Sequence, residues 1–195
     1  MSWIQTFTGK EFDSLNPRVE DVDIFDIAHA LSMKCRFAGH TKYFYSVAQH
    51  SVLVMDHIKE SQLLFLLKES PNPDFLYKTT VRWALLHDAA EAYFADIPNP
   101  IKKEYEIFDT IENKILEAIA LKFGLEWPIS INVKSAVKKS DTALLATEAR
   151  DLLPVIWRGW EEKYKPLALN QNISPWTSIY AEDMFLKAYE ELFSG

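Results

Sequence analysis

The sequence has little of what builds disulfide-bonded, secreted or membrane-spanning proteins. It contains one cysteine, Cys35, so no disulfide can form within the chain, and a reducing compartment fits this composition. The longest clear apolar run, Leu63 to Leu67, is far too short to cross a bilayer. The first residues do not form a basic segment followed by an apolar one, which a signal peptide requires. We therefore expect a cytoplasmic protein.

Positive charge is also scarce, because 21 Lys and Arg face 28 Asp and Glu and give a net charge of −7. A chain of this charge is not expected to bind a nucleic-acid backbone or an anionic membrane surface. An anion that binds here needs local cations or a metal ion. The composition, 48% hydrophobic and 25% charged, is that of a globular domain with a sizeable core.

What is present is mostly helical spacing, since glycine is rare and helix-forming residues are common. The pattern predicts an all-α fold of one domain, residues 1–195, after an irregular N-terminal segment with a small hairpin around Gly9. Ser46 followed by Gln49 is typical of a helix start, and Gly124 of a helix end. We predict roughly seven helices, with a core in residues 20–155 and a last helix packed on it; the clearest are residues 23–35, 46–68, 80–95, 99–123, 132–153 and 175–193.

The segment LLHDAAEAYFADIPNPIKK, residues 85–103, places ionisable side chains where a helix normally turns to its core. At helical spacing His87, Asp88 and Glu91 share one face. Burying several unpaired carboxylates is costly, so two arrangements are open. Either this face is exposed and Leu86 lies on the buried side, or a cation lies among the polar groups.

Imidazole and carboxylate together suit Zn²⁺, Mn²⁺, Fe²⁺, Co²⁺ or Ni²⁺. His87 and Asp88 can coordinate only one side of such an ion, so further ligands must come from other helices. His50 lies in a mostly apolar helix, and Asp141 interrupts an apolar stripe of another. Taken alone, His50 could be a hydrogen-bonded structural histidine and Asp141 a surface residue. Together the four residues form a pattern of H, HD and D on three helices.

This pattern resembles that of the HD-domain metal-dependent phosphohydrolases. The runs HDAAEAYFADIPNPIKK and CRFAGHTKYFYSVAQHS are similar to the branch of bacterial 5′-deoxynucleotidases and phage dATP triphosphohydrolases. The resemblance covers roughly residues 20–155. It implies the HD-domain helical bundle, a small-molecule deoxynucleotide as substrate, a homo-oligomer, and a place in a bacterium or, if phage-encoded, in the host cytoplasm.

The resemblance also implies roles for individual residues. Glu91 would position or activate the attacking water, with Asp96 in support, although Asp96 could instead be a local cap in a turn. Arg36 and Lys102 would contact phosphate, although Arg36 could instead pair with a helix end. Phe37 stands where the family usually has tryptophan beside the sugar and base. The implied ligands of a divalent metal ion are His50, His87, Asp88 and Asp141.

No histidine follows His87 in the chain. The cyclic-nucleotide phosphodiesterases and the dinuclear HD oxygenases resemble this arrangement but add histidines after the HD pair. Their absence favours a mononuclear histidine site. A second ion, bound by carboxylates near Glu91 and Asp96, is not excluded.

The expected activity is metal-dependent hydrolysis of deoxynucleotide 5′-phosphoesters. A monophosphate would yield nucleoside and phosphate; a triphosphate, with dATP the leading candidate, would yield nucleoside and triphosphate. Three alternatives stay open at this point. They are a (p)ppGpp-type pyrophosphohydrolase, a non-catalytic HD module that binds nucleotide, and a purely structural helical protein.

Overall fold

The computed structural model of the chain describes residues 3–61, 71–95, 97 and 99–194. As predicted, the fold is an all-α bundle that follows a small antiparallel hairpin around Gly9. No helix in the described part of the chain is long and apolar enough to span a membrane. The elements are β1 (Ile4–Gln5), β2 (Glu11–Phe12), η1 (Val19–Asp21), α1 (Ile24–Met33), η2 (Phe37–Gly39), α2 (Val47–Glu60), α4 (Pro73–Leu86), η3 (Ala89–Ala92), α5 (Asn99–Glu104), α6 (Glu106–Phe123), α7 (Ile131–Leu152), α8 (Arg158–Tyr164), η4 (Lys165–Leu167) and α9 (Ser178–Phe193).

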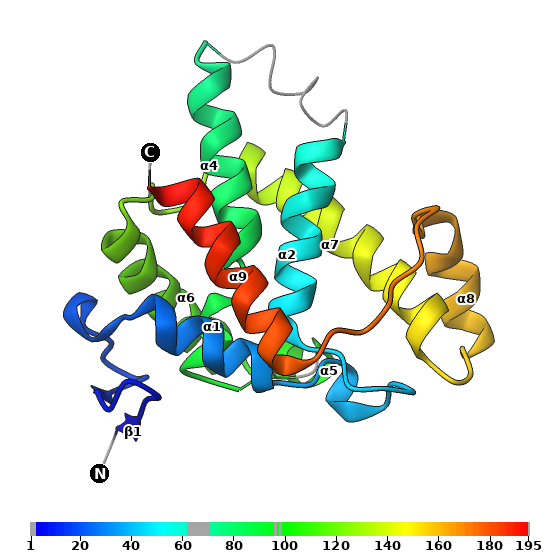
Figure 1. Cartoon of the computed structure of the whole chain (residues 1–195), viewed down its shortest axis with the longest axis horizontal. Coiled ribbons are helices and arrows are strands. Elements are labelled where there is room, and N and C mark those ends of the chain that lie inside the picture. The colour runs from blue at the N-terminus through cyan, green and yellow to red at the C-terminus, as the bar shows by residue number, and fades with distance from the viewer. Residues whose placement is uncertain (1–2, 62–70, 96, 98, 195) are drawn as a thin grey trace.

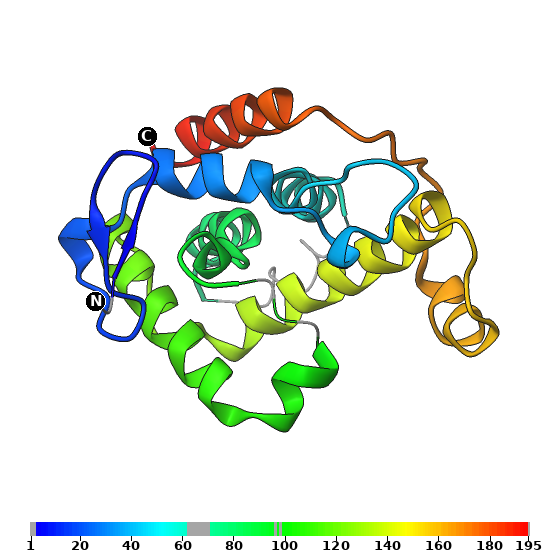
Figure 2. The ribbon, with the colours of Figure 1, turned by 90° about the horizontal axis from the view of Figure 1, so that it is seen from below.

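The helices α2 and α4 pack against each other at the centre of the bundle (Figure 1). Seen along these two helices, α1 and α9 lie side by side across one side of the pair, and α6 and α7 lie on the other (Figure 2). Both central helices contact α7 and α9. The helix α8 projects from the side of the bundle (Figure 1). The central helices and α7 are therefore the elements that meet in the interior.

Several helix ends follow local rules that the sequence displays. The Ser46 side chain accepts a hydrogen bond from Gln49 N, so it caps α2 as predicted. The Gln49 side chain bonds to a different segment of the chain. Its amide group donates to the Ser174 carbonyl at 2.9 Å and accepts from the Trp176 amide at 2.8 Å. These bonds tie residues 174 and 176 to α2, and α9 begins at Ser178, later than predicted, with Thr177 as its N-cap residue.

The helix that carries the polar segment differs from the prediction at both ends. It begins at Pro73 rather than near residue 80, and it ends at Leu86. His87 is its C-cap residue, and the chain then forms the 3₁₀ turn η3 instead of continuing as an α-helix. The Lys34 ammonium donates to the carbonyl oxygens of Glu91 and Phe94, which stabilises this tighter turn. The predicted helical stripe through His87, Asp88 and Glu91 is therefore wrong, although the three residues stay close.

Two other predicted helices also need correction. The helix predicted over residues 99–123 is two helices, α5 and α6, because the backbone at Tyr105 is extended. The helix predicted over residues 46–68 ends earlier, at Glu60, because Ser61 is its C-cap residue with an extended backbone; residues 62–68 lie outside the described residues. The end of α6 at Gly124 is confirmed, since this residue has φ 65°, a conformation that favours glycine.

Most of the buried side chains of the bundle are apolar, and we expect their packing to set the stability of the fold. Leu144 on α7 is fully buried, whereas Leu121 on α6 is 60% exposed. Leu144→Ala is expected to lower the free energy of unfolding by about 2–5 kcal/mol, because it removes buried methyl groups and leaves a cavity. Leu121→Ala is expected to change it by less than about 0.5 kcal/mol. Urea denaturation of both variants measures this, and equal effects would contradict the packing described here.

Candidate metal centre

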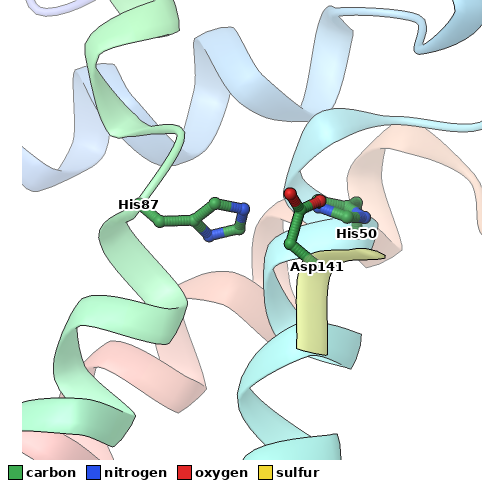
Figure 3. Close-up of side chains that lie close together, drawn as sticks. All are labelled: His50, His87 and Asp141. Atoms are coloured by element: carbon green, nitrogen blue, oxygen red, sulfur yellow. The ribbon is translucent and has the colours of Figure 1, made fainter. Parts of the chain in front are cut away.

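Three polar side chains from three helices meet in the interior of the bundle. His50 lies on α2, His87 follows α4, and Asp141 lies on α7. Each offers a ligand atom within 4.8 Å of the others, so the cluster could hold a metal ion. Figure 3 shows the Asp141 carboxylate between the two imidazole rings. The sequence prediction that these residues meet is confirmed.

Asp88, the fourth predicted ligand, lies at the edge of this cluster. Its Oδ2 atom is 3.3 Å from His87 Nε2 and 3.8 Å from His50 Nε2. The Arg36 guanidinium lies 3.3 Å from the same oxygen. Asp88 is thus close enough to join the other three residues around an ion.

Hydrogen bonds on the far side of each ring orient the two histidines. His87 Nδ1 lies 2.8 Å from the carbonyl oxygen of Ala84, which can only accept, so this nitrogen carries the hydrogen. His50 Nδ1 lies 2.5 Å from a carboxylate oxygen of Glu148. In the neutral rings both Nε2 atoms then present lone pairs, and both are buried without a hydrogen bond in the part of the chain that the structure describes. Two buried lone pairs beside carboxylates fit a divalent metal ion.

Glu148 is a residue of this site that the sequence interpretation missed. It is fully buried, and its carboxylate contacts His50. Burial opposes its ionisation, but the charges of Arg36 and His50 and hydrogen bonds from His50 and Tyr45 lower its pKa to about 2. The signal was its position seven residues after Asp141, which places both residues on one face of α7.

A cleft of about 1730 Å³ opens beside the cluster and contains most of the other predicted site residues. Asp96 lies outside the described residues. Arg36 pairs with Asp88 and Glu148, and Lys102 pairs with Glu112, so both cations already have carboxylate partners. The predicted residues that line the cleft are Arg36, Phe37, His87, Asp88, Glu91, Lys102 and Asp141.

The backbone next to Arg36 is unusual. Phe37 and Ala38 have φ values of 55° and 48°, in a left-handed region that non-glycine residues rarely adopt. Such conformations cost about 1–3 kcal/mol and are often found at functional sites. The turn places Phe37 and Ala38 in the wall of the cleft.

The charges around His50 predict how metal affinity depends on pH. Burial and the Arg36 charge lower the pKa of His50, but Glu148 and Asp141 outweigh them and raise it to about 9 in the metal-free site. An ion must displace this proton, so metal affinity is expected to rise by up to about tenfold per pH unit until pH 9 and then level off. Competition titrations of Mn²⁺ against a chelator measure this. An affinity independent of pH between about 6 and 8 would contradict it.

The fold and the cluster thus define an all-α protein in which a buried histidine and two partly buried side chains, His87 and Asp141, could bind a metal ion. The chain is 37% identical over 195 residues to protein YfdR of Escherichia coli K12, covering 98% of this chain and 96% of the relative. It is 32% identical over 157 residues to protein RCAP_rcc00048 of Rhodobacter capsulatus, covering 77% of this chain and 73% of that protein. The chain therefore belongs to the family of these two proteins, both of which are named as uncharacterized. No protein-family model matches the chain.

Proposed function

We propose that the chain is a metal-dependent phosphohydrolase that cleaves deoxynucleotides at the 5′-phosphoester bond. The observation that carries this proposal is the meeting of His50, His87 and Asp141, with Asp88 at their edge, beside the cleft that three of these residues line. A structural helical protein has no need for two imidazoles whose buried Nε2 atoms lie beside carboxylates without a hydrogen bond from a described residue. The resemblance to HD-domain phosphohydrolases supplies the reaction class.

His50, His87, Asp88 and Asp141 would hold the ion. When bound, a divalent ion polarises a phosphoryl oxygen and lowers the pKa of a water molecule. The ligand set of two imidazoles and two carboxylates suits Mn²⁺, Fe²⁺, Co²⁺, Ni²⁺ or Zn²⁺. The hydrogen bonds from His87 to Ala84 and from His50 to Glu148 fix both rings before an ion arrives.

Glu91 is the candidate for orienting the attacking water and accepting its proton. It follows Asp88 by three residues in the turn η3, and it lines the same cleft. Lys34 anchors this turn through the Glu91 carbonyl, which fixes the backbone from which the Glu91 side chain extends. A carboxylate held beside the reacting phosphorus can serve as a general base.

The cations of the cleft favour a substrate with a long phosphate chain. Arg36 and Lys102 are already paired with carboxylates, which leaves less of their charge for a substrate. Lys134 and Lys139 on α7 also line the cleft, and neither forms an ion pair with another described residue. These lysines can offset the charge of a triphosphate in a chain that is acidic overall. We therefore propose deoxynucleoside triphosphates as the preferred substrates, with Phe37 in contact with the sugar or base.

Product analysis tests this function. Protein loaded in turn with Co²⁺, Mn²⁺ and Zn²⁺ is incubated with each deoxynucleoside monophosphate and triphosphate, and the products are separated by chromatography. Nucleoside together with inorganic triphosphate is the expected result. Nucleoside with phosphate from the monophosphates alone would reassign the substrate. Release of pyrophosphate from a 3′ position of (p)ppGpp, or no turnover in any combination, would contradict the proposal.

A further inference from the structure

The carboxylate of Glu148 lies between His50 of the candidate metal centre and Arg36 of the cleft. Its Oε1 atom lies 2.5 Å from His50 Nδ1 and 2.8 Å from the Tyr45 hydroxyl. Its Oε2 atom accepts a hydrogen bond from Arg36 Nε at 3.2 Å. Since Glu148 is fully buried, water does not compete for these bonds. One side chain thus contacts both a candidate metal ligand and a cation of the cleft.

We infer that Glu148 is a positioning residue for metal binding: it holds His50 with Nδ1 protonated, so that Nε2 faces His87 and Asp141. This inference rests on the metal site of the proposed function. The main-chain carbonyl of Ala84 does the same for His87. Partners of this kind raise the basicity of a ligand, and their loss typically costs about 10- to 100-fold in metal affinity. Through Oε2 the same residue aims Arg36 towards Asp88.

The substitution Glu148→Gln tests this role because it keeps the shape but replaces one accepting oxygen with a donor. If the amide oxygen faces His50, the NH₂ group meets Arg36 Nε, and two donors oppose each other. If the amide is turned, the NH₂ group donates to His50 Nδ1 and moves the ring hydrogen to Nε2. The first arrangement removes the negative charge that makes His50 more basic. The second removes the lone pair of His50 Nε2, which is the atom that would bind the ion.

Tyr45→Phe is the matched control. It removes another hydrogen bond of the same carboxylate without changing the acceptor that His50 needs. Zn²⁺ affinity, measured by competition titration without substrate, is expected to fall by about 10- to 100-fold in Glu148→Gln and by less than about threefold in Tyr45→Phe. Equal affinity in Glu148→Gln and the unsubstituted protein would overturn the inference.

A second measurement needs no substitution at Glu148. Nitrogen-15 NMR of the Zn²⁺-loaded protein distinguishes the two ring nitrogens of His50, and we expect Nδ1 to carry hydrogen and Nε2 to bind the ion. Binding through Nδ1 would overturn the inference even if the variant did not fold. If metal affinity falls in Glu148→Gln but the unsubstituted protein hydrolyses no nucleotide, the proposed function is wrong and the role of Glu148 stands. Turnover with unchanged affinity in Glu148→Gln would defeat only the role of Glu148.

Discussion

His87→Ala is expected to lower metal affinity by about 100-fold or more and to abolish turnover. The substitution removes one of the two imidazole ligands, so that only His50, Asp88 and Asp141 are left to bind the ion. The loss should exceed the tenfold to hundredfold effect typical of residues that merely support a ligand. Isothermal titration with Zn²⁺ measures the affinity, and the product assay measures turnover.

His29→Ala is the control for this experiment. His29 also pairs with a carboxylate, Glu182, at 3.1 Å, but it lies on α1 and does not belong to the group of candidate metal ligands. Its loss should leave metal affinity unchanged. If the two variants bound Zn²⁺ equally well, His87 would not be a ligand and the cluster would not be the metal site.

Glu91→Gln is expected to separate chemistry from binding. Its amide cannot accept a proton from the attacking water, so kcat should fall by about 10²- to 10⁴-fold. Metal affinity should stay within about threefold, because Glu91 is not placed among the ligands. Steady-state kinetics on the metal-loaded variant measure this, with the exposed Glu117 on α6 replaced by glutamine as control. A variant that kept its kcat would exclude Glu91 as the base.

The parts of the fold that could be predicted are those set by local chemistry. Ser46 caps α2, and Gly124 adopts the left-handed conformation that ends α6. The end of α4 could not be predicted in this way. The residues after His87 are good helix formers, and a contact from Lys34, distant in sequence, stabilises the 3₁₀ turn that they form. Tertiary contacts override helix propensity at such positions.

In the candidate site, too, some features could be predicted from the sequence and others depend on tertiary packing. The polar residues His50, His87 and Asp141 in apolar helices suggested a shared cation, because a buried carboxylate needs a partner. The resemblance to HD-domain phosphohydrolases was needed to select His50 and Asp141 as residues that meet His87. The role of Glu148 was hidden, since a glutamate in a charged helical segment is usually exposed. The pairing of Arg36 with two carboxylates was hidden as well, because it depends on how α7 packs against α2 and α4.

Whether the chain needs a metal ion for hydrolysis is tested by measuring turnover while metal is added back to metal-free protein. Metal-free protein is titrated with Co²⁺ or Mn²⁺, and nucleoside release from a deoxynucleoside triphosphate is followed at each ratio of metal to chain. We expect no release without metal and a rise in release that saturates near one bound ion per chain. Release that is independent of added metal, or none at saturating metal, would contradict this expectation.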